Sequence, residues 1–161
     1  MHTINKDLGR IFEDMGCIYE FLGEENRFRA IAYHNASRAL NDLSEDIRNF
    51  IHNGEFEKVH GIGESIEEKI LEYLQNKTIK KYEELKQEIP YDFIDLMQVQ
   101  GLGPQTLKKL HDELNVCSRS DLLKVLEDGS ILKLRGFKKK KVENILEALN
   151  LQKHYEERAT L

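Results

Sequence analysis

The apolar residues of this chain recur at helical spacing along most of its length. In residues 4–22, large apolar side chains return every three or four positions until Gly23. This period predicts an amphipathic helix, and glycine is a common helix stop. A second helix is predicted from about Asn26 to Leu40, with Arg29 and Tyr33 on its outer side. Its inward face is expected to hold Phe28, Ile31, Ala32, Ala36, Ala39 and Leu40.

Two further segments complete the first half of the chain. Ser44 has the residue type of an N-cap, so we expect a short helix that begins there and ends at Gly54. Its buried residues are expected to be Ile47, Phe50 and Ile51. Residues 76–90 carry a charged helical pattern that Pro90 ends. We therefore predict two domains, residues 1–88 and residues 89–161.

A short glycine turn occurs three times between helical patterns. The three copies read VHGIG from Val59, VQGLG from Val99 and LRGFK from Leu134. Apolar residues flank the first glycine of each copy, and a helical pattern follows each turn. Repeats at intervals of roughly 35 to 40 residues indicate repeated two-helix units.

The chemistry of such a turn suits a phosphate group. The first glycine of each copy (Gly61, Gly101 and Gly136) can adopt the left-handed conformation that ends a helix. The second glycine, Gly63 or Gly103, lacks a Cβ, so another backbone can approach it closely. The next helix begins with unpaired N–H groups, which attract anions. Contacts of this kind hold a sugar–phosphate backbone and do not read bases. Tight interhelical packing is the alternative role for these glycines.

The charge of the chain is unevenly distributed. With 24 basic and 29 acidic residues, the net charge of -5 by itself argues against a nucleic-acid partner. Lysines nevertheless follow two of the turns. We expect the second turn, with Lys108 and Lys109, to be the strongest phosphate site. In the third copy Lys138 replaces the second glycine, and Lys138 and Lys139 add positive charge, although this lysine run could also be only a solvated helix face. Glu64 should weaken the first site, because its carboxylate repels phosphate.

Composition narrows the classes of protein that this chain can be. The chain has two prolines and few runs of β-branched residues, which favours an all-α fold. No apolar stretch approaches the ~18 residues that cross a membrane. The N-terminal pattern is also unlike a signal peptide, so we expect a cytoplasmic protein. Cys17 and Cys117 are too few for a disulfide framework, and the six histidines lack metal-ligand spacing. We therefore expect no metal held by side chains.

The three turns, with the sequence ENRFRAIAYHNASRAL upstream of them, resemble the N-terminal helix-hairpin-helix region of family X DNA polymerases. The resemblance is strongest to the bacterial and archaeal type and covers roughly residues 5–150. It implies an all-α protein of two small helical subdomains. The first would be a lyase-like four-helix domain with the first hairpin, and the second would hold the other two hairpins. The chain has no D-x-D pair for polymerase magnesium ions, so the resemblance implies no polymerization by these residues alone.

The same resemblance identifies a candidate nucleophile. In DNA polymerase β and its relatives, a lysine in the helix after the first hairpin attacks an abasic deoxyribose through a Schiff base. Lys69 occupies that position in this chain. The resemblance also implies that Tyr33 lines the lyase pocket and that Arg29 and Lys81 hold a 5′-phosphate.

Several residues depart from the family's lyase pattern. Ser65 and Glu57 stand where the family has basic residues. Glu72 lies one turn beyond Lys69 and would favour the charged form of its amine. An ordinary solvated helix lysine is therefore the alternative reading of Lys69.

Taken together, these features predict a sequence-independent DNA-binding protein in DNA repair. We expect a monomer that binds nicked, gapped or single-strand-containing DNA. Two alternatives stay open: an abasic-site (5′-deoxyribose phosphate) lyase that uses Lys69, and a protein-interaction module whose hairpins stack on a partner. The resemblance implies no cofactor beyond a monovalent cation held by hairpin backbone carbonyls.

Overall fold

The computed structural model describes residues 3–160, with side chains described as far as residue 152. Within this range the chain is all-α apart from one pair of very short strands, as predicted. It divides into two compact units, Met1–Glu88 and Ile89–Leu161. The division falls beside Pro90. No helix among the described residues is both long and apolar enough to cross a membrane.

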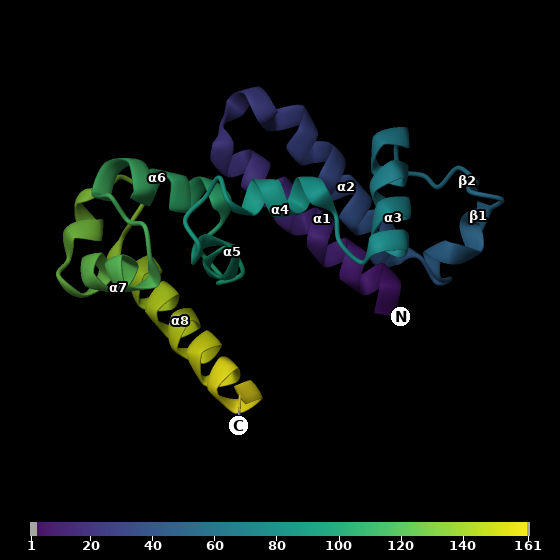
Figure 1. Ribbon diagram of the computed structural model, residues 1–161. Helices are drawn as coiled ribbons and strands as arrows, with labels where there is room; N and C mark the ends of the chain where they lie inside the picture. The colour runs from purple at the N-terminus through teal and green to yellow at the C-terminus, as the bar shows by residue number, and fades with distance from the viewer. Residues whose placement is uncertain (1–2, 161) are drawn as a thin grey trace. The chain divides into compact units, whose positions relative to one another are not determined.

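The first unit is built around a pair of long helices (Figure 1). Helix α1 spans Thr3–Leu22 and, after the 3-10 turn η1 (Glu24–Asn26), helix α2 spans Arg27–Asp42. The segment η2 (Ile47–Phe50) leads into strands β1 (Ile51–His52) and β2 (Glu55–Phe56). Helices α3 (Glu64–Asn76) and α4 (Lys80–Lys86) complete the unit.

Small and polar residues bring α1 and α2 close together. The Ser37 hydroxyl of α2 donates a 2.7 Å hydrogen bond to the Gly9 carbonyl of α1. The buried side chain of Asn5 donates to the Glu45 carbonyl and accepts from the Ile47 N–H, so it anchors the segment that follows α2. These bonds satisfy polar groups that would otherwise be costly to bury.

The inward face of α2 differs from the sequence prediction. Phe28 is 82% exposed and Ile31 is 44% exposed, whereas Tyr33 is buried. Tyr33 stacks on Tyr19 of α1 with ring centroids 5.6 Å apart, and it also contacts Phe12. The predicted face was therefore wrong at Phe28, Ile31 and Ala32, because this aromatic contact rotates the buried stripe. The buried residues of α2 are Ala30, Tyr33, Ala36, Ser37 and Leu40.

The segment after α2 also differs from its prediction. No helix runs from Ser44 to Gly54; a short 3-10 turn is capped by Asp46, which accepts a hydrogen bond from the Arg48 N–H. Strands β1 and β2 then pair through a turn at Asn53 and Gly54, whose φ values are 54° and 81°. Positive φ at both positions is typical of a type I′ hairpin, which Asn-Gly favours. The Asn53-Gly54 dipeptide predicts this turn, but the prediction of a helix followed the spacing of the apolar residues instead.

The charged helix predicted over residues 76–90 is shorter in the structure. Helix α3 extends to Asn76 and ends where Lys77 takes a left-handed conformation, with φ of 63°. Helix α4 then occupies only Lys80–Lys86. The residues between the two helices turn the chain. The single helix predicted over residues 76–90 is therefore replaced by the end of α3, a turn and the short helix α4.

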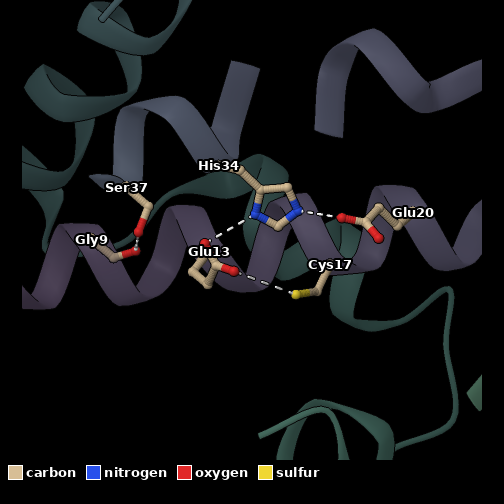
Figure 2. Close-up of polar contacts among 6 residues, drawn as sticks. All are labelled: Gly9, Glu13, Cys17, Glu20, His34 and Ser37. Atoms are coloured by element: carbon tan, nitrogen blue, oxygen red, sulfur yellow. Dashed lines mark hydrogen bonds and ion pairs between the residues drawn. The ribbon is translucent and has the colours of Figure 1, made fainter. Parts of the chain in front are cut away.

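His34 links α1 and α2 through two carboxylates (Figure 2). Its Nδ1 lies 3.0 Å from Glu13 Oε2, and its Nε2 lies 2.6 Å from Glu20 Oε1. The hydrogen bond with Glu13 raises the pKa of His34, and the same bond lowers the pKa of Glu13. Arg38 adds to the lowering of the Glu13 pKa.

This bridge predicts a pH-dependent stability. The raised pKa of His34 adds stability that is fully present below its ordinary value of 6.5 and is lost as pH rises through the raised value. The lowered pKa of Glu13 adds stability that is present above 4.5 and is lost as pH falls. Urea denaturation in metal-free buffer should therefore show that His34→Gln costs more stability at pH 5.5 than at pH 8.5. An equal cost at both values would contradict this account.

The second unit consists of short helices around an apolar core. It contains α5 (Phe93–Leu96), α6 (Pro104–Leu114), α7 (Arg119–Glu127), the 3-10 turn η3 (Ser130–Lys133) and α8 (Lys139–Thr160). Figure 1 shows these elements in teal to yellow. Fully buried residues come from several of them and from the connecting turns: Phe93, Leu96, Leu102, Leu107, Leu110, Val116, Leu122, Ile131 and Ile145.

Candidate nucleic-acid interface

All three predicted turns share one backbone geometry. In each copy, the N–H of the apolar residue after the first glycine donates to the carbonyl three residues earlier. The acceptor is the carbonyl of the apolar residue two positions before the glycine. This bond joins the two apolar positions that flank the first glycine in all three copies. These bonds measure 3.0 to 3.3 Å and join Ile62 to Val59, Leu102 to Val99 and Phe137 to Leu134.

The first glycine of each turn has a conformation that other residues rarely adopt. The φ values are 91° at Gly61, 93° at Gly101 and 93° at Gly136. Side chains with a Cβ are strained in this region. The near-identical values in three separate turns show that the glycine is required by the hairpin itself.

The second position of each turn has a different role. Gly63 and Gly103 precede the first residues of α3 and α6, with φ of -85° and -70°. A Cβ added at either position would meet no atom within 4 Å. The fold therefore tolerates a side chain there, which explains why Lys138 can occupy the same position in the third turn. The absence of a side chain leaves the outer surface of the first two turns open to another molecule.

The helices that follow the first two turns begin without a side-chain cap. Gly63 and Gly103 have no side chain that could accept a hydrogen bond from the first N–H groups of α3 or α6. Helix α7, which follows no such turn, is capped by the Ser118 hydroxyl, an acceptor for the Asp121 N–H. Uncapped N–H groups and the positive end of the helix dipole favour an anion at the two hairpin helices.

The lysines that the sequence analysis assigned to the second and third turns divide into two groups. Lys109 donates a 2.5 Å hydrogen bond to the Arg135 carbonyl and therefore connects the second hairpin to the third. Lys108 lies 3.9 Å from Asp112. Lys138 and Lys139 are exposed at the start of α8. The third turn thus carries more accessible positive charge than the second, a difference that sequence spacing could not show.

A pocket of about 750 Å³ lies in the first unit. It brings together the six residues of the first unit that the sequence analysis proposed as DNA-binding or catalytic. The residues come from α2, from the hairpin turn, from α3 and from α4: Arg29, Tyr33, Gly61, Gly63, Lys69 and Lys81. Phe28 and Tyr19 also line this pocket, and the sequence analysis assigned neither to it.

The surroundings of Lys69 differ from the sequence prediction at Glu72. The Glu72 carboxylate accepts a 2.7 Å hydrogen bond from the Lys80 N–H at the start of α4. The Lys69 ammonium instead lies 3.4 Å from the Ser65 hydroxyl. Glu72 thus binds the start of α4, and the structure shows no ion pair between Glu72 and Lys69 among the residues it describes. Both Lys69 and Ser65 line the pocket.

Two tyrosines, Tyr19 and Tyr33, line the pocket. Burial raises the pKa of Tyr33 well above its ordinary range, and the neighbouring Tyr19 raises it further, while Arg29 opposes the shift. The Tyr33 hydroxyl therefore stays protonated as a hydrogen-bond donor at neutral pH. The Arg29 guanidinium lies 5.9 Å from the Tyr19 ring centre. The Tyr33 hydroxyl and three cationic side chains, those of Arg29, Lys69 and Lys81, thus line the same pocket.

These features define a class of protein, and comparison with known families identifies it. Residues 3–79 match a helix-hairpin-helix domain, and residues 93–151 match a SAM-like helix-hairpin-helix tandem. The chain is therefore built of helix-hairpin-helix domains. The two matched regions fall in the two compact units described above.

One characterised relative is the DNA polymerase/3′-5′ exonuclease PolX of Bacillus subtilis (strain 168). The chain is 31% identical to its N-terminal part over 144 residues, which are 89% of this chain and 25% of that protein. This similarity confirms the predicted resemblance to the N-terminal region of a family X polymerase. The chain spans about a quarter of the relative's length. Together, these matches support DNA binding by the chain.

Proposed function

We propose that this protein binds DNA without regard to base sequence, through the backbone amides of its helix-hairpin-helix turns and nearby lysines. The observation that carries the proposal is the repeated turn, with one hydrogen bond and one glycine conformation in all three copies. The open surface at Gly63 and Gly103 lets a sugar–phosphate chain reach the helix N-termini. Contacts to phosphates position DNA and carry no sequence information.

A salt titration tests this binding mode. The logarithm of the affinity should fall linearly with the logarithm of the salt concentration, with a slope of about -0.9 for each phosphate neutralised in duplex DNA. We expect roughly three to five such contacts from the clustered cations. Fluorescence anisotropy on duplexes of unrelated sequence should give affinities within a few-fold of one another. A strong preference for one sequence would contradict the proposal, and binding to a protein but to no DNA would favour an interaction module.

The DNA structure that we propose as ligand is one with a gap or nick and a 5′-phosphate, as in DNA repair. The pocket of the first unit supports this choice, because Arg29 and Lys81 place two cationic side chains beside the hairpin turn. Exposed Phe28 at the same pocket offers an aromatic face for an unpaired base. The protein would act as a monomer, and carbonyls of the hairpin turns would hold a monovalent cation at the DNA contact.

A second proposed function is cleavage at an abasic site by Lys69. The specific observation in its favour is that Lys69 lines the same pocket as Tyr33, Arg29 and Lys81. The neutral amine would attack the C1′ aldehyde of the open-chain deoxyribose, and loss of water would form a Schiff base. Removal of a C2′ proton would then expel the 3′-phosphate by β-elimination. Hydrolysis of the Schiff base would free Lys69 for another cycle.

A further inference from the structure

We propose that Glu13, Cys17 and His34 form a binding site for Zn²⁺ between α1 and α2. One ligand atom from each residue can be chosen so that all three lie within 4.8 Å of one another. Figure 2 shows the three side chains directed toward one another from the two helices. The site stands apart from the proposed function, because none of its residues lines the pocket that holds Lys69.

The ligand atoms lie somewhat farther apart than in a zinc centre. His34 Nδ1 lies 3.0 Å from one Glu13 oxygen, Oε2, and Cys17 Sγ lies 3.9 Å from the other, Oε1, while one ligand atom from each residue lies within 4.8 Å of the other two. Zinc binds nitrogen, oxygen and sulfur at about 2.0–2.3 Å, so its ligand atoms are separated by roughly 3.3–3.8 Å in a tetrahedral site. Small side-chain rotations would therefore place the three atoms around one ion. Sulfur, nitrogen and oxygen ligands together suit zinc better than magnesium or calcium.

The two helices are shaped to hold the imidazole at this place. Glu13 and Cys17 are four residues apart and so share one face of α1. Between them lies Gly16, where an added Cβ would be only 2.7 Å from His34 Cε1. The ring of His34 therefore packs directly on the α1 backbone, and position 16 can carry no side chain without moving it.

Glu20 gives the site a supporting carboxylate. It lies 2.6 Å from His34 Nε2, so it can accept the proton of that nitrogen. With its second nitrogen held in this way, His34 can bind a metal ion through Nδ1 once that nitrogen has lost its proton. Histidines that bind metals usually donate their second N–H to a carboxylate in this way.

Three carboxylates, those of Glu13, Asp14 and Glu20, lie near the Cys17 thiol. Burial and the nearby carboxylates of Glu13, Glu20 and Asp14 raise the pKa of Cys17 to about 12. A zinc ion neutralises this negative charge and displaces the thiol proton of Cys17 and the Nδ1 proton of His34. Binding therefore releases up to two protons and strengthens as pH rises. The Glu13 side chain is 47% exposed, which gives an ion access from solvent.

Three protein ligands leave a fourth position for water. The ion would join α1 to α2, the helix that carries Arg29 and Tyr33 to the pocket. Its expected effect is therefore to stabilise the first unit. Sequence spacing did not predict this site, because its ligands come from two helices and only the packing of those helices brings them together.

Cobalt titration of the untagged chain tests the site. Co²⁺ at pH 8 should give one equivalent of a thiolate-to-cobalt charge-transfer band in the near ultraviolet, which Zn²⁺ then removes by displacement. Zn²⁺ should also raise the melting temperature of the chain. Glu20→Gln should retain the band and weaken Zn²⁺ binding by about 10- to 100-fold.

The two cysteines provide a matched pair of controls. Cys17→Ser should lose the charge-transfer band while keeping the circular dichroism spectrum of the native chain. Cys117→Ser should keep the band, although Cys117 also lies near a histidine, 3.7 Å from His111 Nδ1. Absence of the band from the native chain would overturn the proposal. Persistence of the band in Cys17→Ser, or its loss in Cys117→Ser, would overturn it as well.

Discussion

Replacement of Lys69 by alanine should remove most of the covalent adduct that borohydride forms between this protein and DNA carrying a 5′-deoxyribose phosphate. The reason is that borohydride traps only a Schiff base, and Lys69 is the lysine of α3 that lines the pocket with Tyr33 and Arg29. A lysine amine in water is largely protonated at neutral pH. Trapping by the native chain should therefore increase with pH until the amine is neutral or another step limits the rate.

Two further variants separate chemistry from binding. Lys69→Arg keeps the positive charge but cannot form a Schiff base, so it should bind gapped DNA like the native chain and trap no adduct. Lys77→Ala removes a lysine just beyond the C-terminal end of α3, outside the pocket residues, and should trap normally. If Lys69→Ala traps as well as the native chain, another amine does the chemistry. If the native chain traps nothing at any pH, the lyase proposal fails while DNA binding through the hairpins stands on its own.

Replacement of Gly103 by leucine should weaken DNA binding by about ten- to a hundredfold. A side chain at this position would cover the N-terminus of α6 and block a hydrogen bond to phosphate, worth about 1.5–3 kcal/mol for a charged acceptor. The fold should survive, because φ at Gly103 is -70° and a Cβ there would meet no atom within 4 Å. Fluorescence anisotropy gives the affinity, and circular dichroism and thermal melting check the fold.

The matched variant is Gly63→Leu in the first hairpin. Its backbone conformation is nearly that of Gly103, and an added Cβ would likewise meet no atom within 4 Å, so the structural cost should be similar. The loss of DNA affinity should be smaller, only a few-fold, because the Glu64 carboxylate already repels phosphate at the start of α3. Charge reversal of Lys108 and Lys109 should lower both the affinity and the salt slope. Equal losses at Gly63 and Gly103 in folded variants would contradict this ranking of the hairpins.

The sequence by itself determined the features that depend on neighbouring residues. The apolar period of residues 4–22 and the stop at Gly23 predicted α1. The three glycine turns were predicted correctly because a positive φ and one short hydrogen bond involve only a few consecutive residues. The Asn53-Gly54 turn was equally local, and it was missed only because a helical period was given more weight than the turn residues.

Only the tertiary structure decided which groups meet. The buried stripe of α2 follows Tyr33 rather than Phe28, since the contact of Tyr33 with Tyr19 depends on how α1 and α2 pack. The sequence resemblance named Lys69 and Lys81, but packing places them around one pocket and turns Glu72 away to cap α4. The cluster of Glu13, Cys17 and His34 has no sequence signature at all. The physical reason is common to these cases: the helical period fixes each helix's own apolar face, whereas the rotation and contact of two helices depend on side chains distant in sequence.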